Sequence, residues 1–200
     1  MWRSIGLMLC GLWLTACTVT ELDADGKPIL PVDPTAVVGY QNLTLTEVAD
    51  KLWLAKILPE ATAQPLHWQE AKSQRDAMSS GSKKSVFVHF QGTVSGVEIN
   101  KHKGVMYLEI DGKTVAFQLG RIIKGNAIRD ASSFISFDDF KNQVRFAKLS
   151  RELNKRAIAG IDAPDSSWIG ETVSIVAAVT LSDKGIRDAV PLQVSRGESR

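Results

Sequence analysis

The chain has 200 residues, which is enough for one ordinary domain together with targeting segments. An apolar fraction of 44% and a charged fraction of 23% are globular values and exclude an intrinsically disordered chain. The 24 basic and 22 acidic residues leave a formal net charge of +2 without a clustered Lys/Arg run, so the composition excludes an electrostatic nucleic-acid-binding surface.

The N-terminal segment is typical of a bacterial export signal. Arg3 precedes an apolar run from Ile5 to Leu14, which is too short to span a bilayer because a membrane helix needs about 20 apolar residues. The run ends in Leu14-Thr15-Ala16-Cys17. This motif resembles the bacterial lipobox, whose cysteine is diacylated on sulfur and becomes the new N-terminus. We therefore predict a lipoprotein signal peptide at residues 1–16 and palmitate-type lipid attachment at Cys17.

The composition then divides the mature chain into a tether and a domain. Residues 17–42 are rich in Asp, Gly and Pro and lack a sustained apolar period, which predicts a flexible tether. Residues 43–200 are predicted to form a single globular domain. Since Cys10 is lost with the signal peptide, the mature chain keeps one cysteine and can form neither an internal disulfide nor a cysteine metal site. The protein should be lipid-anchored in the cell envelope and face the periplasm, with the outer or inner membrane left open.

Two helices are predicted at the start of the domain. Thr44 and Glu47 have the spacing of a capping box and precede apolar residues on one helical face, in a helix that should end near Pro59. A second helix is expected over Pro65–Met78, because proline is tolerated in a first helical turn.

The apolar period changes to two from Ser85 onward, which indicates strands. Asp111-Gly112 separates two such runs and is the strongest hairpin signal in the chain, so a three-stranded meander is predicted over 85–119. Ser136 with Asp139 predicts a helix over 137–156, and strands should follow at 172–179 and after Pro191. Five short strands with a helix between strands 3 and 4 and N-terminal helices are typical of an OB-like barrel in the α+β class. The alternative is a generic α+β sandwich with one helix-covered sheet.

Enzyme motifs are absent from the sequence. His67, His89 and His102 are isolated and lack metal-ligand spacing, and neither a nucleophile elbow nor a phosphate-binding glycine loop occurs. The paired carboxylates Asp138 and Asp139 are explained by the dipole of the helix that they begin. We therefore predict no catalytic residues, no metal and no cofactor.

The segment 118–130 and the helix after it hold the candidate binding residues. Gln143, Ala147, Ser150 and Asn154 share one helical stripe, while apolar residues occupy both sides of the helix and predict that both sides are buried. Polar groups in such a place need hydrogen-bond partners. In one interpretation they tie an irregular loop to the barrel, and in the other they bind a small polar ligand or a partner's backbone. The candidates are Arg129, Asp130, Asn142, Gln143 and Asn154.

The same segment resembles a known family. The pattern Leu119-Gly120, Ile123, Gly125, Ala127, Arg129-Asp130-Ala131, continued by Asn142-Gln143 and Leu153-Asn154, resembles the predicted periplasmic lipoproteins called domain of unknown function 2291. The resemblance extends over about residues 43–195. Arg121 departs from the family pattern, in which a proline is expected here. The resemblance implies an envelope location and, in many bacteria, genes beside those of sugar ABC transporters, but no activity.

These observations leave hypotheses of different classes. The first is a membrane-tethered, non-enzymatic accessory module that binds a small polar ligand or an envelope protein, such as an ABC-transport component. The second is a purely structural envelope lipoprotein, and an enzyme is the third. Partner and ligand identity and oligomeric state stay open, and the fold alone supports none of the three.

The lipid anchor gives the first testable prediction. Cys17→Ser removes the sulfur on which the thioether forms, so the variant should remain uncleaved and should incorporate no palmitate analogue during metabolic labelling. Cys10→Ser is the matched control and should be labelled like the unaltered protein. Equal labelling of the Cys17→Ser variant would exclude Cys17 as the attachment site.

Overall fold

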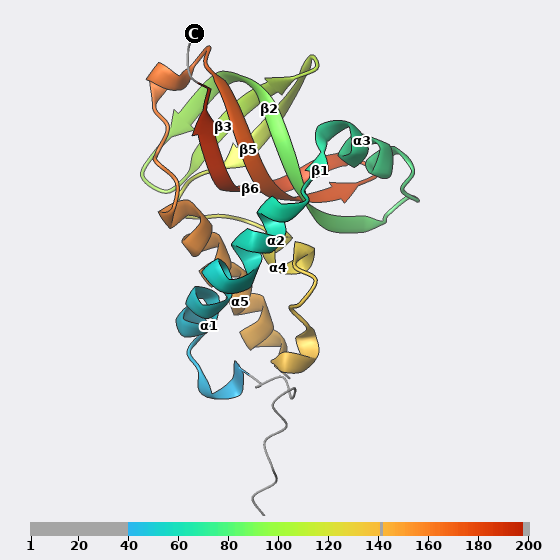
Figure 1. Ribbon diagram of the computed structural model, residues 1–200, viewed down its shortest axis with the longest axis vertical. Coiled ribbons are helices and arrows are strands. Elements are labelled where there is room, and N and C mark those ends of the chain that lie inside the picture. The colour runs from blue at the N-terminus through green and yellow to red at the C-terminus, as the bar shows by residue number, and fades with distance from the viewer. Residues whose placement is uncertain (1–39, 141, 198–200) are drawn as a thin grey trace, which may run out of the picture. The chain divides into compact units, whose positions relative to one another are not determined.

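The computed structural model describes residues 40–140 and 142–197, in which most of the helices gather on one side of a curled sheet (Figure 1). The predicted signal peptide, Cys17 and most of the tether lie outside the described residues. The elements are, in chain order, η1 (Tyr40–Asn42), α1 (Leu45–Leu52), the π-helical η2 (Trp53–Ile57), α2 (Leu58–Ala63), β1 (Leu66–His67), α3 (Trp68–Asp76), β2 (Lys83–Ile99), β3 (Gly104–Ile110), β4 (Lys113–Gln118), α4 (Ala127–Ala131), η3 (Phe137–Asp139), α5 (Gln143–Ala159), η4 (Ser166–Trp168), β5 (Thr172–Ser182) and β6 (Gly185–Arg196).

The sheet has the strand order of the predicted OB-like fold. Its five main strands run β4-β3-β2-β5-β6, every neighbouring pair is antiparallel, and the short β1 adds a parallel pair to β2. The two ends of this path, β4 and β6, come close in space, so the sheet curls into a partly closed barrel. Helix α5 lies between β4 and β5 in the chain, as predicted.

Strand β2 belongs to both halves of the barrel. Its residues 83–93 pair with β5, whereas its residues 93–99 pair with β3. Gly92 lies where the strand passes from one partner to the other. A Cβ atom at Gly92 would meet the backbone oxygen of Glu109 and lie 2.8 Å from Cγ1 of Ile110. The absence of a side chain at this position therefore lets β3 cross β2 closely.

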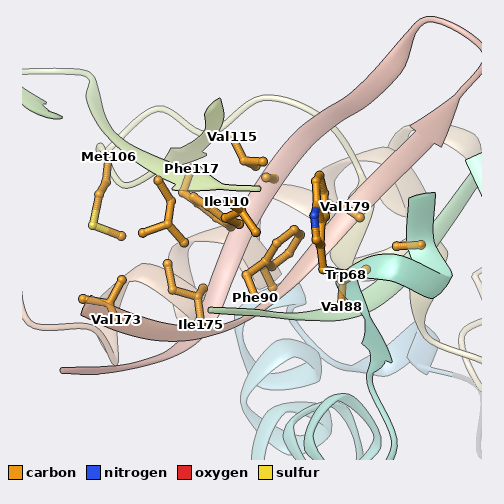
Figure 2. Packing of buried hydrophobic residues seen from close by; sticks show 14 of the residues in the cluster. Trp68, Val88, Phe90, Met106, Ile110, Val115, Phe117, Val173, Ile175 and Val179 are labelled. Carbon is orange, nitrogen blue, oxygen red and sulfur yellow. The ribbon is translucent and has the colours of Figure 1, made fainter. Parts of the chain in front are cut away.

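One apolar core fills the interior of the barrel (Figure 2). Val88 and Phe90, two residues apart on β2, both point into this core. The rings of Phe90 and Phe117 pack edge to face at 5.1 Å, and the ring of Trp68 lies 5.6 Å from Phe90. The indole nitrogen of Trp68 donates to Asp111 at 3.0 Å, which ties α3 to the β3–β4 turn.

A second core lies between the outer face of the sheet and the helices. Phe87, which is adjacent to Val88 in β2, points to this other face because strand side chains alternate. Helix α1 packs on α5, and α4 packs on both α5 and β2. The fully buried members from the helices are Val48, Ile57, Ala61, Ala127, Ile128, Leu149, Leu153 and Ala157.

The predicted N-terminal boundaries need two corrections. Tyr40–Asn42, assigned to the tether, pack on the domain: the ring of Tyr40 stacks on Phe140 at 5.4 Å, and Arg145 donates to the carbonyls of Tyr40 at 2.7 Å and of Leu43. The first helix also continues beyond Pro59 to Ala63. Proline is tolerated there because the π-helical turn η2 changes the hydrogen-bonding register and places Pro59 in the first turn of α2.

The later boundaries differ as well. Ser136 and Asp139 do form a capping box, but they cap the short η3, and α5 begins at Gln143. The last strand is also longer than predicted, since β6 starts at Gly185 and includes Pro191. That proline lies beside an irregularity in the pairing with β5, where a missing N–H is tolerated. Within 40–140 and 142–197, no helix is long and apolar enough to cross a membrane.

The close crossing at Gly92 gives a stability prediction. Gly92→Ala forces backbone and side-chain shifts that typically cost about 1–3 kcal/mol. Gly96→Ala, in the same strand, is the matched control, because its Cβ would have ordinary contact with Tyr107 at 3.4 Å. Thermal unfolding should show a melting temperature lowered by several degrees for Gly92→Ala and little changed for Gly96→Ala. Equal melting temperatures of the two variants would contradict this account of the crossing.

Candidate functional site

A groove of about 960 Å³ separates the loop after β4 from helix α5. One wall is the loop 120–126 and the other is one face of α5. The groove is lined by Gly120, Arg121, Ile122, Ile123, Lys124, Gly125 and Asn126 from the loop, and by Ala147, Ser150, Arg151, Asn154, Lys155, Ile158 and Ala159 from the helix. A volume of this size is sufficient for a small molecule.

Backbone hydrogen bonds hold the loop although it has no regular structure. The side chain of Gln118 donates to the carbonyl of Lys124 at 3.0 Å and accepts from its N–H at 2.8 Å. The N–H of Ile122 donates to the carbonyl of His102 at 3.1 Å. Gly120 packs against the backbone of Lys103, where a Cβ would come within 2.6 Å. These contacts give the groove a preformed wall.

Gly125 joins the loop to α5. Its φ of +90° is a conformation that favours glycine, and a Cβ there would lie 2.6 Å from the carboxyl carbon of Asp188. Its carbonyl accepts a hydrogen bond of 3.2 Å from Nδ2 of Asn154. Since a carbonyl can only accept, this contact also determines which end of the Asn154 amide faces Gly125. The bond from Asn154 therefore fixes the width of the groove at this point.

Two polar atoms at the groove have no hydrogen-bond partner among the described residues. Oδ1 of Asn154 and Oγ of Ser150 are fully buried and unpaired, and each residue is 2% exposed. A serine in a helix usually bonds the carbonyl four residues earlier, which for Ser150 is that of Phe146. That carbonyl accepts from the helix N–H and also from Nη1 of Arg129 at 3.2 Å. Arg129 thus occupies the place that the Ser150 hydroxyl would take.

Arg129 itself has a structural position rather than a place in the groove. Its side chain is 10% exposed, its guanidinium lies 4.0 Å from the ring centroid of Phe146, and Nη2 lies 2.6 Å from Oδ1 of Asp130. Arg129 joins α4 to α5, whereas Asp130 pairs with Arg129 within α4, and neither residue lines the groove. The geometry supports the interpretation that Arg129 holds the fold together, while Asp130 is exposed and lines a separate hollow with Lys83 and Lys84.

Of the three remaining predicted candidates, one lines the groove and two do not. Asn154 lines the groove and also holds the loop through its bond to the Gly125 carbonyl, so its position is compatible with both interpretations. Asn142 is instead the N-cap of α5, accepting from the N–H of Arg145 at 3.0 Å, and Gln143 is exposed outside the groove. The expectation that both sides of α5 are buried holds for part of the helix: Ser150 and Asn154 on the polar stripe are buried, whereas Gln143 and Val144 are exposed at its first turn.

Four basic residues of the groove were not among the predicted candidates. Arg121 and Lys124 come from the loop, and Arg151 and Lys155 come from α5. The spacing of four between Arg151 and Lys155, which places like charges on one helical face, is the signal that was available in the sequence. The meeting of the two pairs across a groove depends on the tertiary fold.

The family comparison covers nearly the whole chain. The model of the family described as "Predicted periplasmic lipoprotein (DUF2291)" matches residues 7–195. No curated protein sequence matches the chain.

Solved structures support the fold. An OB-fold protein from Thermotoga maritima superposes with a TM-score of 0.58 at 18% identity, over 78% of this chain and 100% of that chain. At that identity the similarity establishes the OB-like fold alone. The Stn1–Ten1 complex of S. pombe has a TM-score of 0.27 at 11% identity, over 56% of this chain and 59% of that chain, which is too low to indicate a shared fold.

The position of Arg129 gives a second stability prediction. Arg129→Ala removes the bond to the Phe146 carbonyl and the packing on the Phe146 ring, and loss of a buried hydrogen-bond partner typically costs about 1–3 kcal/mol. Thermal unfolding should show a melting temperature that is several degrees lower. Arg121→Ala is the control, since Arg121 is exposed, and it should unfold like the unaltered protein. An unchanged melting temperature for Arg129→Ala would show that α4 and α5 are held together by other contacts.

Proposed function

This chain belongs to the predicted periplasmic lipoprotein family, and we propose that it is a membrane-tethered, non-enzymatic binding module whose recognition site is the groove between loop 120–126 and α5. The ligand enters between the two walls and contacts Ser150 and Asn154. The domain supplies a preformed surface near the membrane that holds the anchor.

The unpaired atoms of Ser150 and Asn154 carry this proposal. A buried polar atom without a partner costs about 1–3 kcal/mol, and such atoms are rare in native proteins. If the unpaired atoms of Ser150 and Asn154 had no role, apolar side chains of similar size at these positions would avoid that cost. A ligand that pairs with Oγ of Ser150 and Oδ1 of Asn154 offsets that cost when it binds, which accounts for two such atoms on one wall.

The composition of the groove supports binding rather than catalysis. Its lining contains no His, Cys, Asp or Glu, so none of the imidazole or carboxylate bases that most often activate a serine lies in the groove. Positioning and hydrogen bonding are the chemistry that these side chains provide.

A transport-linked role is the more specific form of the proposal. The family resemblance implies genes beside those of sugar ABC transporters, so the ligand or partner would belong to a transport system, for example its substrate-binding component. Genomic proximity supports this by association alone. The purely structural alternative rests on Arg129 and on the Nδ2 contact of Asn154, both of which hold the loop to the helix.

Hydrogen exchange of the full lipidated protein in neutral detergent tests the proposal. A small-molecule filtrate of periplasmic extract should slow amide exchange at 120–126 and 147–158. Ala147→Trp places a ring in the groove from an exposed position and should abolish this protection, whereas Lys148→Trp, exposed on α5 outside the groove, should retain it.

A second arm uses the macromolecular fraction of the same extract. Protection by this fraction alone would identify the occupant of the groove as an envelope protein, such as a substrate-binding component, and would exclude a small molecule. Absence of protection with both fractions would contradict the groove as a recognition site.

A further inference from the structure

We propose that the ligand of the groove is a small anion that carries a hydroxyl group, such as a phosphorylated polyol or a hydroxy acid. This inference rests on the proposed function and specifies the chemistry of its site. It follows from the charge of the two walls and from the hydrogen-bonding atoms at the base of the groove.

The groove concentrates positive charge that the chain as a whole lacks. The sequence is nearly balanced, with 24 basic and 22 acidic residues, yet the groove lining holds four basic residues and no acidic one. Arg121 and Lys124 stand on the loop, and Arg151 and Lys155 stand on α5. Basic groups on both walls of one hollow attract an anion between them.

Few acidic side chains of the protein pair with these four basic residues. Within the residues described, the side chains of Arg121, Lys124 and Arg151 form no ion pair, and Lys155 pairs with Glu152 at 2.8 Å. Asp188 lies beside Gly125 but does not line the groove; it lines two other hollows, one of which Lys124 also lines. Arg151 and Lys155 are like charges one helical turn apart, an arrangement that mildly destabilises a helix and that an anion bound between them would relieve.

The hydrogen-bonding atoms require a donor on the same ligand. Asn154 uses its Nδ2 on the Gly125 carbonyl, so the unpaired atom is Oδ1, which can only accept. The Ser150 hydroxyl can donate or accept. A fully ionised anion such as sulfate would satisfy the cations but would leave Oδ1 of Asn154 unpaired. A hydroxyl next to the anionic group satisfies both.

Two sources supply this chemistry in an envelope. One is a soluble metabolite, and the other is the glycerol phosphate headgroup of an anionic phospholipid. Ile122, which is 54% exposed, and Ile158 add apolar surface to the groove, which suits the carbon skeleton of either source. The shared requirement is the anion with an adjacent hydroxyl.

Calorimetric titration of the full lipidated protein in neutral detergent tests the inference. The probes are sn-glycerol 3-phosphate and D-gluconate, with glycerol as the uncharged comparison and sulfate as the anion without a donor. At least one of the first two should bind, about tenfold or more tightly than glycerol and sulfate, because charge-assisted hydrogen bonds are the strong ones. Raising the salt concentration should weaken that binding.

Arg151 and Lys148 are exposed, so their variants keep the test independent of folding. Arg151→Gln should weaken binding of the probe by about tenfold, since it removes one charge-assisted contact, and Ser150→Ala should also weaken it. Lys148→Gln, an exposed charge on α5 outside the groove, should leave binding unchanged. Equal binding by Arg151→Gln and the unaltered protein would overturn the inference.

The source of the ligand is distinguished by adding phosphatidylglycerol to the micelles. Suppression of probe binding identifies the lipid headgroup as the occupant, and retained binding identifies a soluble metabolite; both support the shared chemistry. If neither anionic probe binds, or glycerol binds equally well, the anionic assignment is wrong. The proposed function then still stands if either fraction of the periplasmic extract protects the groove from exchange, and it fails too if neither fraction does.

Discussion

The double pairing of β2 is the constraint on which the rest of the structure depends. A strand that pairs with β5 along its first part and with β3 along its second must bend between them, and Gly92 leaves the space in which that crossing occurs. Because side chains alternate along a strand, Val88 and Phe90 point into the barrel, while Phe87 faces the helices. The barrel core and the core under the helices therefore lie on opposite faces of β2.

The groove follows from that arrangement. After β4 the chain must travel from the barrel to the helical layer, and loop 120–126 makes this passage against the face of α5. The loop does not collapse onto the helix, because it is held in place by the side chains of Gln118 and Asn154 and by the close packing of Gly120. Proteins that share the OB-like fold have unrelated functions. The chemistry of this protein therefore has to be derived from the two walls of the groove, loop 120–126 and α5, rather than from the barrel.

The sequence correctly predicted the turns and helix caps that depend on residues close together in the chain. The Asp111-Gly112 turn has positive φ at both residues, as its hairpin requires, and Thr44 with Glu47 forms the expected capping box, whose hydrogen bonds lower the pKa of the Glu47 carboxyl. Ser136 has the same local signature, yet it caps a single short turn, because α5 begins anew at Asn142, whose side chain caps it. No local rule distinguishes these two caps. The pairing of Arg129 with the Phe146 carbonyl, and the unpaired Ser150 hydroxyl that results, likewise require the tertiary fold.

The contact of η1 with α5 has a mechanical consequence. A lipoprotein is held at its N-terminal end, so tension between membrane and domain enters the fold at Tyr40. It is resisted there by the ring of Phe140 and by Arg145, which bonds the carbonyls of Tyr40 and Leu43. Arg145 lies in the first turn of α5, the helix that forms one wall of the groove. A pull from the membrane would therefore act on the groove wall before it reaches the strands on which α5 packs.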